Sequence, residues 1–157
     1  MFYKNAKIYT EDFQFHLGAF SVENGKFQEV LAENVPADAV DLGGDYVIPG
    51  LIDVHSHGNS GADFSDGDME GLKTMTAYYA RNGITSVAPA SMTLPYDVLD
   101  KAFCTAAEYR KTEHPGHARL VGIQMEGPFF SEKKKGAQNA DYLRLPDFEA
   151  FRKLQEH

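Results

Sequence analysis

From residue 49 onward the sequence alternates short apolar runs with longer segments that have helical spacing. The strand-like runs lie at 51–55, 84–90 and 120–126, and the helical segments at 68–83, 94–111 and from near Pro146 to the end. Apolar runs of this length are typical of strands that are buried on both faces. Three successive β/α units predict an α/β fold with parallel strands joined by right-handed crossovers.

The helical segments carry their own start and stop signals. Gly83 follows Asn82 and ends the first helix. Thr93 is the predicted cap of the second helix, with Pro95 in its first turn. The apolar positions of the first helix keep a helical spacing: Met69, Leu72, Met75 and Tyr79.

The first 48 residues have a different character. Two strand-like runs flank Asn24-Gly25, a pair that suits the positive φ angles of a type I′ hairpin turn. We expect antiparallel β structure over 2–48, and a domain division into residues 1–48 and 49–157. With 157 residues, of which 43% are hydrophobic, the chain is long enough for one cored domain of ordinary size.

Composition excludes several classes of partner. The formal charge is −8, with 23 acidic and 15 basic residues, which argues against a nucleic-acid-binding face. The N-terminus lacks the apolar region of a signal peptide, and no stretch reaches the roughly 18 apolar residues of a membrane span. Cys104 is the single cysteine and is predicted to be a small buried hydrophobe, so we expect a cytoplasmic protein.

Metal-ligating residue types follow two of the predicted strands. His55 and His57 lie two residues apart and point to the same side if the strand continues through them. Glu126 ends the third strand, directly before Gly-Pro. In parallel α/β folds ligands collect at the carboxyl ends of strands. Imidazole and carboxylate suit zinc or ferrous iron, which could activate water and polarise an amide carbonyl for hydrolysis.

Each residue also has a simpler interpretation. Taken alone, a His-x-His pair is more often two strand-end histidines without a metal, and Glu126 is more often an exposed acid. Asp53 is either a partner that orients a histidine or a satisfied buried acid. His114 and His117 are interpreted as polar loop residues, and the lysine run 133–135 as a solvated face. The combination of the His-x-His pair and Glu126 at strand ends favours the metal site.

Two motifs resemble a known family. The first, "PGLIDVHSHG", resembles the signature at the first barrel strand of the amidohydrolase superfamily, which dihydroorotases, hydantoinases and ureases share. The second, "MEGPFFSEKKKGAQN", is similar to a stretch of the N-acetylglucosamine-6-phosphate deacetylases. The resemblance covers essentially the whole chain. It implies the first three β/α units of a (β/α)8 TIM-type barrel, preceded by a small antiparallel β-sandwich portion.

The resemblance also implies roles for individual residues. Glu126 matches the family's metal-ligand glutamate, and His55 and His57 match a pair that binds a second metal in some members. Ala137 and Gln138 fall where the family contacts its sugar phosphate, although many members have histidine at the second position. The implied reaction hydrolyses N-acetylglucosamine 6-phosphate to glucosamine 6-phosphate and acetate, with a divalent metal, zinc or iron, as cofactor.

A complete barrel of this kind needs about 250 residues, so the resemblance implies an incomplete fragment. The family's catalytic aspartate and two further metal-ligand histidines have no counterpart here, and no catalytic residue is assigned. An open parallel sheet exposes unpaired edges, so we expect a homo-oligomer. The alternatives are a catalytically silent truncated fold that persists as an oligomer, and another amidohydrolase such as a dihydroorotase-like enzyme.

Overall fold

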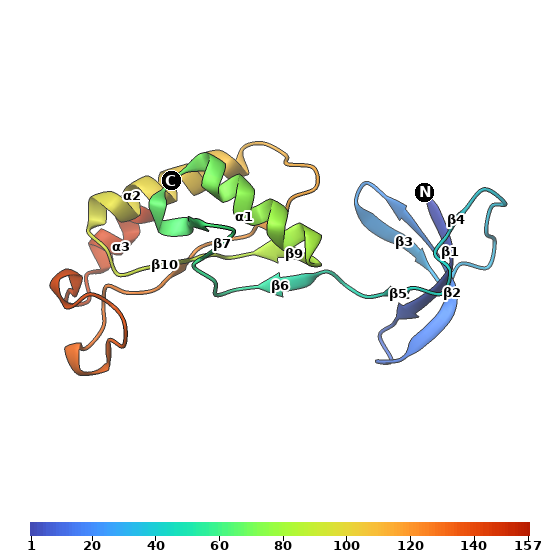
Figure 1. Cartoon of the computed structure of the whole chain (residues 1–157), viewed down its shortest axis with the longest axis horizontal. Coiled ribbons are helices and arrows are strands. Elements are labelled where there is room, and N and C mark those ends of the chain that lie inside the picture. The colour runs from blue at the N-terminus through green and yellow to red at the C-terminus, as the bar shows by residue number, and fades with distance from the viewer. The chain divides into compact units, whose positions relative to one another are not determined.

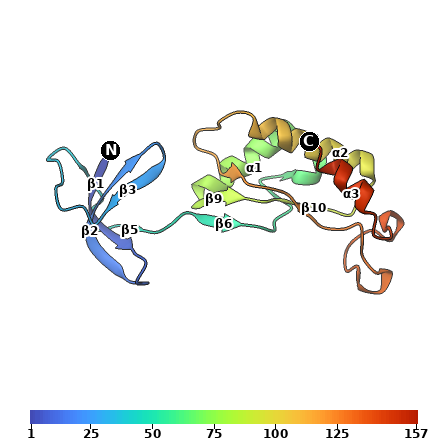
Figure 2. The same ribbon diagram turned by 180° about the vertical axis from the view of Figure 1, so that it is seen from behind.

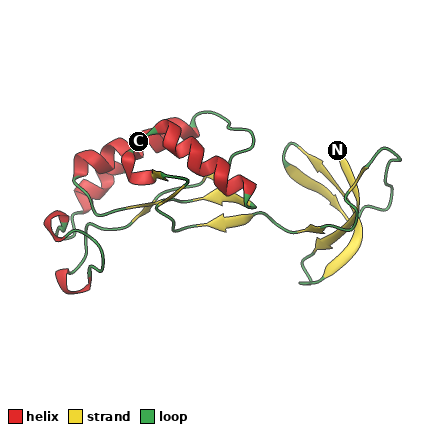
Figure 3. Cartoon of the chain, viewed as in Figure 1, coloured by secondary structure: helices red, strands yellow, loops and turns green.

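The computed structural model describes residues 1–157. The chain divides into two compact units, Met1–Pro49 and Gly50–His157. Figure 1 labels the elements of both units, and Figure 3 shows that the first holds strands and loops while the second holds helices and strands. The second unit carries the residues of the candidate site.

The first unit is one five-stranded sheet. Strands β1 (Phe2–Tyr9), β2 (Phe15–Glu23) and β3 (Lys26–Val30) pair antiparallel in the order β3-β2-β1. The predicted Asn24-Gly25 turn is confirmed, since their φ angles are 51° and 71°. The expectation of purely antiparallel pairing is wrong. The chain crosses from β3 to the far side of β1, where β4 (Val40–Asp41) and β5 (Tyr46–Val47) pair parallel to it.

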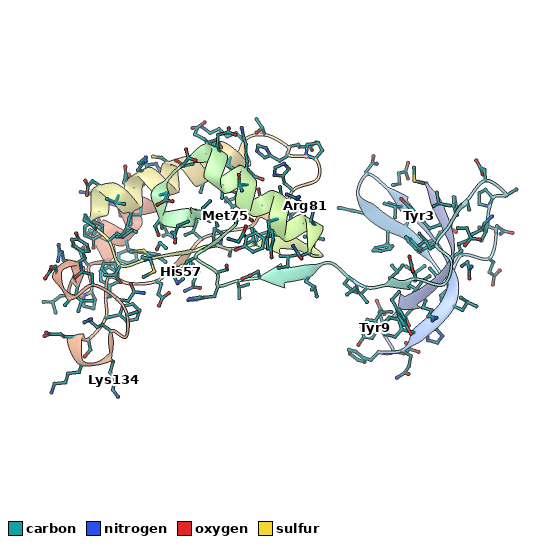
Figure 4. The ribbon with its side chains drawn as sticks, in the orientation of Figure 1. Tyr3, Tyr9, His57, Met75, Arg81 and Lys134 are labelled. Carbon is teal, nitrogen blue, oxygen red and sulfur yellow. The ribbon has the colours of Figure 1, made fainter.

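The core of this unit is small. Ala6, Ile8 and Phe20 are buried in it. Tyr3 stacks on Phe20 with ring centroids 4.9 Å apart, an offset arrangement that adds to the burial of both rings. Figure 4 labels Tyr3 and Tyr9 on this sheet.

The second unit contains parallel strands that are neighbours in chain order. Strands β6 (Leu51–Asp53), β9 (Ile84–Val87) and β11 (Arg119–Leu120) form a sheet in the order β11-β9-β6. Strands β10 (Ala90–Ser91) and β12 (Gln124–Met125) pair parallel further along the same runs. The predicted parallel pairing is therefore confirmed, although the runs 84–90 and 120–126 are each broken into two short strands.

Helices and short turns connect these strands. The helices are α1 (Met69–Arg81), α2 (Tyr96–Arg110) and α3 (Phe148–Leu154), with 3₁₀ turns η1 (Phe64–Asp66), η2 (Glu132–Lys134) and η3 (Ala140–Tyr142). The glycine-rich loop after β6 holds a small hairpin of β7 (Gly58–Asn59) and β8 (Ala62–Asp63). The unit is a mixed α/β structure. No helix is long and apolar enough to cross a membrane.

Helices α1 and α2 lie on one side of the strands of this unit, as the two opposite views show (Figures 1 and 2). Leu72, Met75 and Tyr79 of α1 are buried, as their spacing predicts, and Met69 packs at the margin of the core. The remaining buried members come from η1, β9, α2, β11 and the residue before β11: Phe64, Val87, Ala102, Ala106, Tyr109, Ala118 and Leu120. Figure 4 shows Met75 between α1 and the strands.

Two predictions about α2 are wrong. Pro95, not Thr93, is the residue at its N-terminus, and no side chain caps it. Thr93 is instead buried, with its hydroxyl turned toward Glu126. Cys104 is half-buried rather than buried, because it lies on the flank of α2 beside His157.

Helix α1 has the side-chain cap that α2 lacks. The Asp68 carboxylate accepts a hydrogen bond from the Gly71 backbone N–H at 2.6 Å. We expect Asp68→Ala to lower the free energy of unfolding by about 1 kcal/mol, because one helix-end N–H loses its partner. Urea denaturation measures this. Asp68→Ser keeps a capping oxygen and should lose much less, and equal losses in the two variants would contradict the capping role.

Candidate metal centre

Three metal-ligating side chains converge at the carboxyl ends of β6 and β12. The Glu126 Oε2 atom lies 3.0 Å from the Nε2 atoms of both His55 and His57. The three ligand atoms all lie within 4.8 Å of one another. The His57 side chain is labelled in Figure 4 near the middle of this unit. The structure thus brings together residues that are about 70 positions apart in the sequence.

The two histidines are oriented by backbone contacts. His57 Nδ1 lies 3.1 Å from the carbonyl oxygen of Ala90, and because a carbonyl only accepts, Nδ1 carries the proton. Its Nε2 lone pair is then free to bind a metal, the arrangement usual for metal-bound histidine. Asp53 accepts the backbone N–H of His55 at 2.9 Å and is half-buried. It therefore orients the backbone of His55 rather than its imidazole.

Glu126 contributes the charge of the site. Its Oε2 atom is buried and has no hydrogen-bond partner, although two imidazole nitrogens lie 3.0 Å away. The distances are those of an ion pair, but no ring N–H is aligned with the oxygen. A buried carboxylate oxygen without a partner is costly. A cation held between the oxygen and the two nitrogens would remove that cost.

The donor set fits a transition metal. Zinc bonds of about 2.0–2.2 Å to nitrogen and oxygen place neighbouring ligands of a tetrahedral ion about 3.4 Å apart. The observed 3.0 Å separations are close to this value. Two imidazoles and a carboxylate suit zinc or iron alike.

A second network holds the backbone of Glu126. The buried Thr93 hydroxyl donates to the Glu126 carbonyl oxygen at 3.3 Å. The Thr93 backbone N–H donates to Gln138 Oε1 at 2.8 Å. Gln138 is buried and Ala137 beside it is exposed. Sequence reasoning missed Thr93, since a threonine two residues before a helix is also the usual signal of a cap.

Gln138 therefore has a structural contact whether or not a ligand binds. We expect Gln138→Met to lower the free energy of unfolding by about 1–3 kcal/mol, because the buried Thr93 N–H loses its acceptor. Urea denaturation of the ligand-free protein measures this, with the exposed Gln155→Met as control. An unchanged stability in Gln138→Met would mean that its amide serves only a ligand.

A hydroxyl pair supports the segment between the two histidines. Tyr79, buried on α1, donates its hydroxyl to Ser56 Oγ at 2.6 Å. Ser56 lies between His55 and His57, so this bond ties the strand end to the helix. The sequence pattern identified Tyr79 only as a core residue.

The other histidines and the lysine run lie outside this cluster. His114 stacks on Tyr109 with ring centroids 3.8 Å apart, and His117 Nδ1 lies 3.1 Å from Thr76 Oγ1. Interpreting these two histidines as polar loop residues was therefore incomplete, because both pack against helices. Burial raises the pKa of Tyr109. Lys134 extends into solvent (Figure 4), whereas Lys135 donates to the Gln138 carbonyl oxygen at 2.7 Å.

Comparison with known proteins gives consistent matches, although no family model matches the chain. An N-acetylglucosamine-6-phosphate deacetylase of Bacillus subtilis is 32% identical over 165 residues, covering 98% of this chain and 40% of the relative. The enzyme of the same name from Vibrio furnissii is 38% identical over 110 residues, covering 69% of this chain and 27% of the relative. The chain thus spans less than half the length of these relatives.

A solved structure extends the match to the fold. The crystal structure of N-acetylglucosamine-6-phosphate deacetylase from Pasteurella multocida aligns with a TM-score of 0.87 and 29% identity, covering 99% of this chain and 42% of that one. The sequence and structural matches therefore concern the same part of the same enzyme. On sequence and fold together, the chain matches the N-terminal portion of the N-acetylglucosamine-6-phosphate deacetylases.

Proposed function

We propose that this chain is the metal-binding front part of a deacetylase that hydrolyses N-acetylglucosamine 6-phosphate to glucosamine 6-phosphate and acetate. The observation that carries the proposal is the buried, unpartnered Glu126 Oε2 atom facing two imidazole nitrogens. The names of the relatives supply the substrate class. The three parallel strands in chain order support an assignment to the start of a (β/α)8-type barrel, with residues 1–48 as part of a β-sandwich.

Glu126, His55 and His57 would hold the metal. A bound zinc or ferrous ion supplies an activated water and polarises the amide carbonyl. Glu126 provides the negative charge, and the Ala90 carbonyl keeps the His57 Nε2 atom unprotonated. Thr93 holds the Glu126 backbone in place through the hydrogen bond from its hydroxyl to the Glu126 carbonyl oxygen. We assign no catalytic acid or base to this chain.

Gln138 and Ala137 are the proposed contacts to the sugar phosphate. Gln138 Oε1 is already bound to the Thr93 N–H. Its carboxamide nitrogen makes no hydrogen bond within the protein and has two protons to donate to a phosphate or hydroxyl oxygen. Ala137 is exposed and presents no bulk that would hinder a ligand. The loop would therefore both support the Glu126 segment and face the substrate.

We propose further that copies of this chain associate. Leu51, Ile52 and Val54 of the β6 segment are 50%, 66% and 60% exposed. β6 is an edge strand, and α1 and α2 lie on one side of the sheet. A parallel sheet is normally covered on both faces. Sedimentation equilibrium should give a mass that rises with concentration, and a monomer at all concentrations would contradict this.

The activity is tested with the 157-residue chain itself, loaded with zinc or ferrous iron. Acetate release from N-acetylglucosamine 6-phosphate, with none from N-acetylglucosamine, which lacks the phosphate, would show that an assembly of these chains completes a working site. Dihydroorotate in parallel tests the dihydroorotase-like alternative. Metal binding without turnover on any of these would show that the site forms but that this chain does not catalyse the reaction.

A further inference from the structure

A second cluster of metal-ligating side chains lies on the flank of α2, separate from the centre at Glu126. Asp100 and Cys104 are four residues apart and share one face of the helix. The segment after α3 brings His157 to them. His157 Nε2 lies 2.8 Å from Asp100 Oδ1, and Cys104 Sγ lies 3.4 Å from both ring nitrogens of His157. The three ligand atoms lie within 4.8 Å of one another.

The distance between Cys104 Sγ and the His157 ring nitrogens suits ligands of one ion better than a catalytic pair. Zinc bonds of about 2.3 Å to sulfur and 2.0 Å to nitrogen place these two atoms about 3.5 Å apart in a tetrahedral site. The observed separation is 3.4 Å. Because Sγ is equally far from both ring nitrogens, it is not in line with the lone pair of either. A nucleophilic cysteine needs such an aligned base, so the arrangement does not favour that role.

The surroundings favour a cation. A hollow beside the cluster, between α2 and α3, is lined by Asp97, Asp100, Asp147 and Glu149, with Lys153 as its one basic side chain. Four carboxylates against one ammonium give a negative local potential, which raises the local concentration of cations. The cluster itself adds a sulfur and an imidazole, the donors that distinguish a transition-metal site from a solvated acidic surface.

We propose that Asp100, Cys104 and His157 bind one divalent transition metal, zinc by donor type, that links the segment after α3 to α2. Helix α3 has seven residues, of which only Leu154 is buried. It packs with Leu99 and Phe103 of α2. A metal shared between the two segments would stabilise this docking, because the free energy of metal binding adds to that of the folded state.

Cobalt absorption tests the site selectively. Cys104 is the only cysteine of the chain, so a thiolate-to-cobalt charge-transfer band in the near ultraviolet reports this site alone. We expect the reduced protein to develop the band on titration with Co²⁺ and to lose it when Zn²⁺ is added. Cys104→Ser should abolish it. The triple variant His55→Gln, His57→Gln, Glu126→Gln should keep it, which separates this site from the one proposed for catalysis.

The remaining variants test the other two ligands. Asp100→Asn and His157→Gln should each weaken cobalt binding by at least about tenfold, the range for loss of groups that hold a metal site. Asp97→Asn removes the same charge from the same helix without removing a ligand, and should change affinity by less than about threefold, as exposed charges do. A missing band in the wild type, or unchanged affinity in His157→Gln, would overturn the proposal.

Discussion

Glu126→Gln is expected to abolish tight metal binding at the His55, His57 and Glu126 centre, with an affinity loss of more than about 100-fold. Changing a residue that only hydrogen-bonds to a metal ligand already lowers metal affinity by about 10–100-fold. Glu126 is expected to be a ligand itself, and it is the one anionic group of this cluster. Glutamine has nearly the same shape, so the loss isolates charge and donor strength. Zinc titration by calorimetry measures the affinity, in a Cys104→Ser background that removes the second cluster.

Stability in a chelator separates a metal centre from an ordinary ion pair. If the cluster binds a metal, the metal-free protein carries an unpartnered buried carboxylate oxygen, and Glu126→Gln should leave its free energy of unfolding unchanged or raise it. If protonated His55 and His57 instead pair with Glu126, the same change should destabilise the protein. Glu132→Gln is the matched control, an exposed glutamate in η2 that should change neither quantity.

Gly127→Ala is expected to lower the free energy of unfolding by about 2–5 kcal/mol, combining overpacking of about 1–3 kcal/mol with a left-handed backbone penalty of about 1–2 kcal/mol. Gly127 has a φ of 84°, and a Cβ there would lie 1.9 Å from Thr93 Oγ1. Because the Thr93 hydroxyl also donates a hydrogen bond to the Glu126 carbonyl oxygen, relieving this clash should shift the Glu126 backbone and weaken metal binding as well. Urea denaturation and zinc calorimetry measure the two effects.

Gly136→Ala provides the comparison for this substitution. Gly136 also has a positive φ, 60°, but a Cβ there meets nothing within 4 Å. It should therefore cost only the backbone penalty, about 1–2 kcal/mol. Adding Thr93→Ala to Gly127→Ala removes the atom that causes the clash and should recover part of the stability. Equal losses in Gly127→Ala and Gly136→Ala would show that the close contact with Thr93 has no role.

Local sequence signals were sufficient for several elements of both units. The spacing of Leu72, Met75 and Tyr79 predicted the buried face of α1, because a helix presents every third or fourth residue to the same side. The Asn24-Gly25 turn followed from the positive φ angles that these two residues accept. The motifs at 49–58 and 125–139 indicated the family resemblance and the candidate ligands from the sequence alone.

Features that depend on contacts between distant parts of the chain could not be predicted from local sequence patterns. Thr93 carries a pattern typical of a cap, but burial against Gly127 and Gln138 gives its hydroxyl another partner. The parallel pairing of β4 and β5 with β1 depends on where a connecting segment crosses the sheet. Cys104 and His157 are 53 residues apart, and only the docking of α3 on α2 brings them together.

By itself the sequence determined the helices, the first hairpin and the parallel strands of the second unit, together with the residue types that can bind a metal. The tertiary structure alone decided which of those residues meet. It placed Glu126 Oε2 in a buried position facing two imidazoles. It also brought Thr93 into hydrogen-bond contact with the Glu126 carbonyl oxygen and with Gln138. The reason is that a metal centre depends on distances between strand ends, and these are set by packing of the whole sheet rather than by any local pattern.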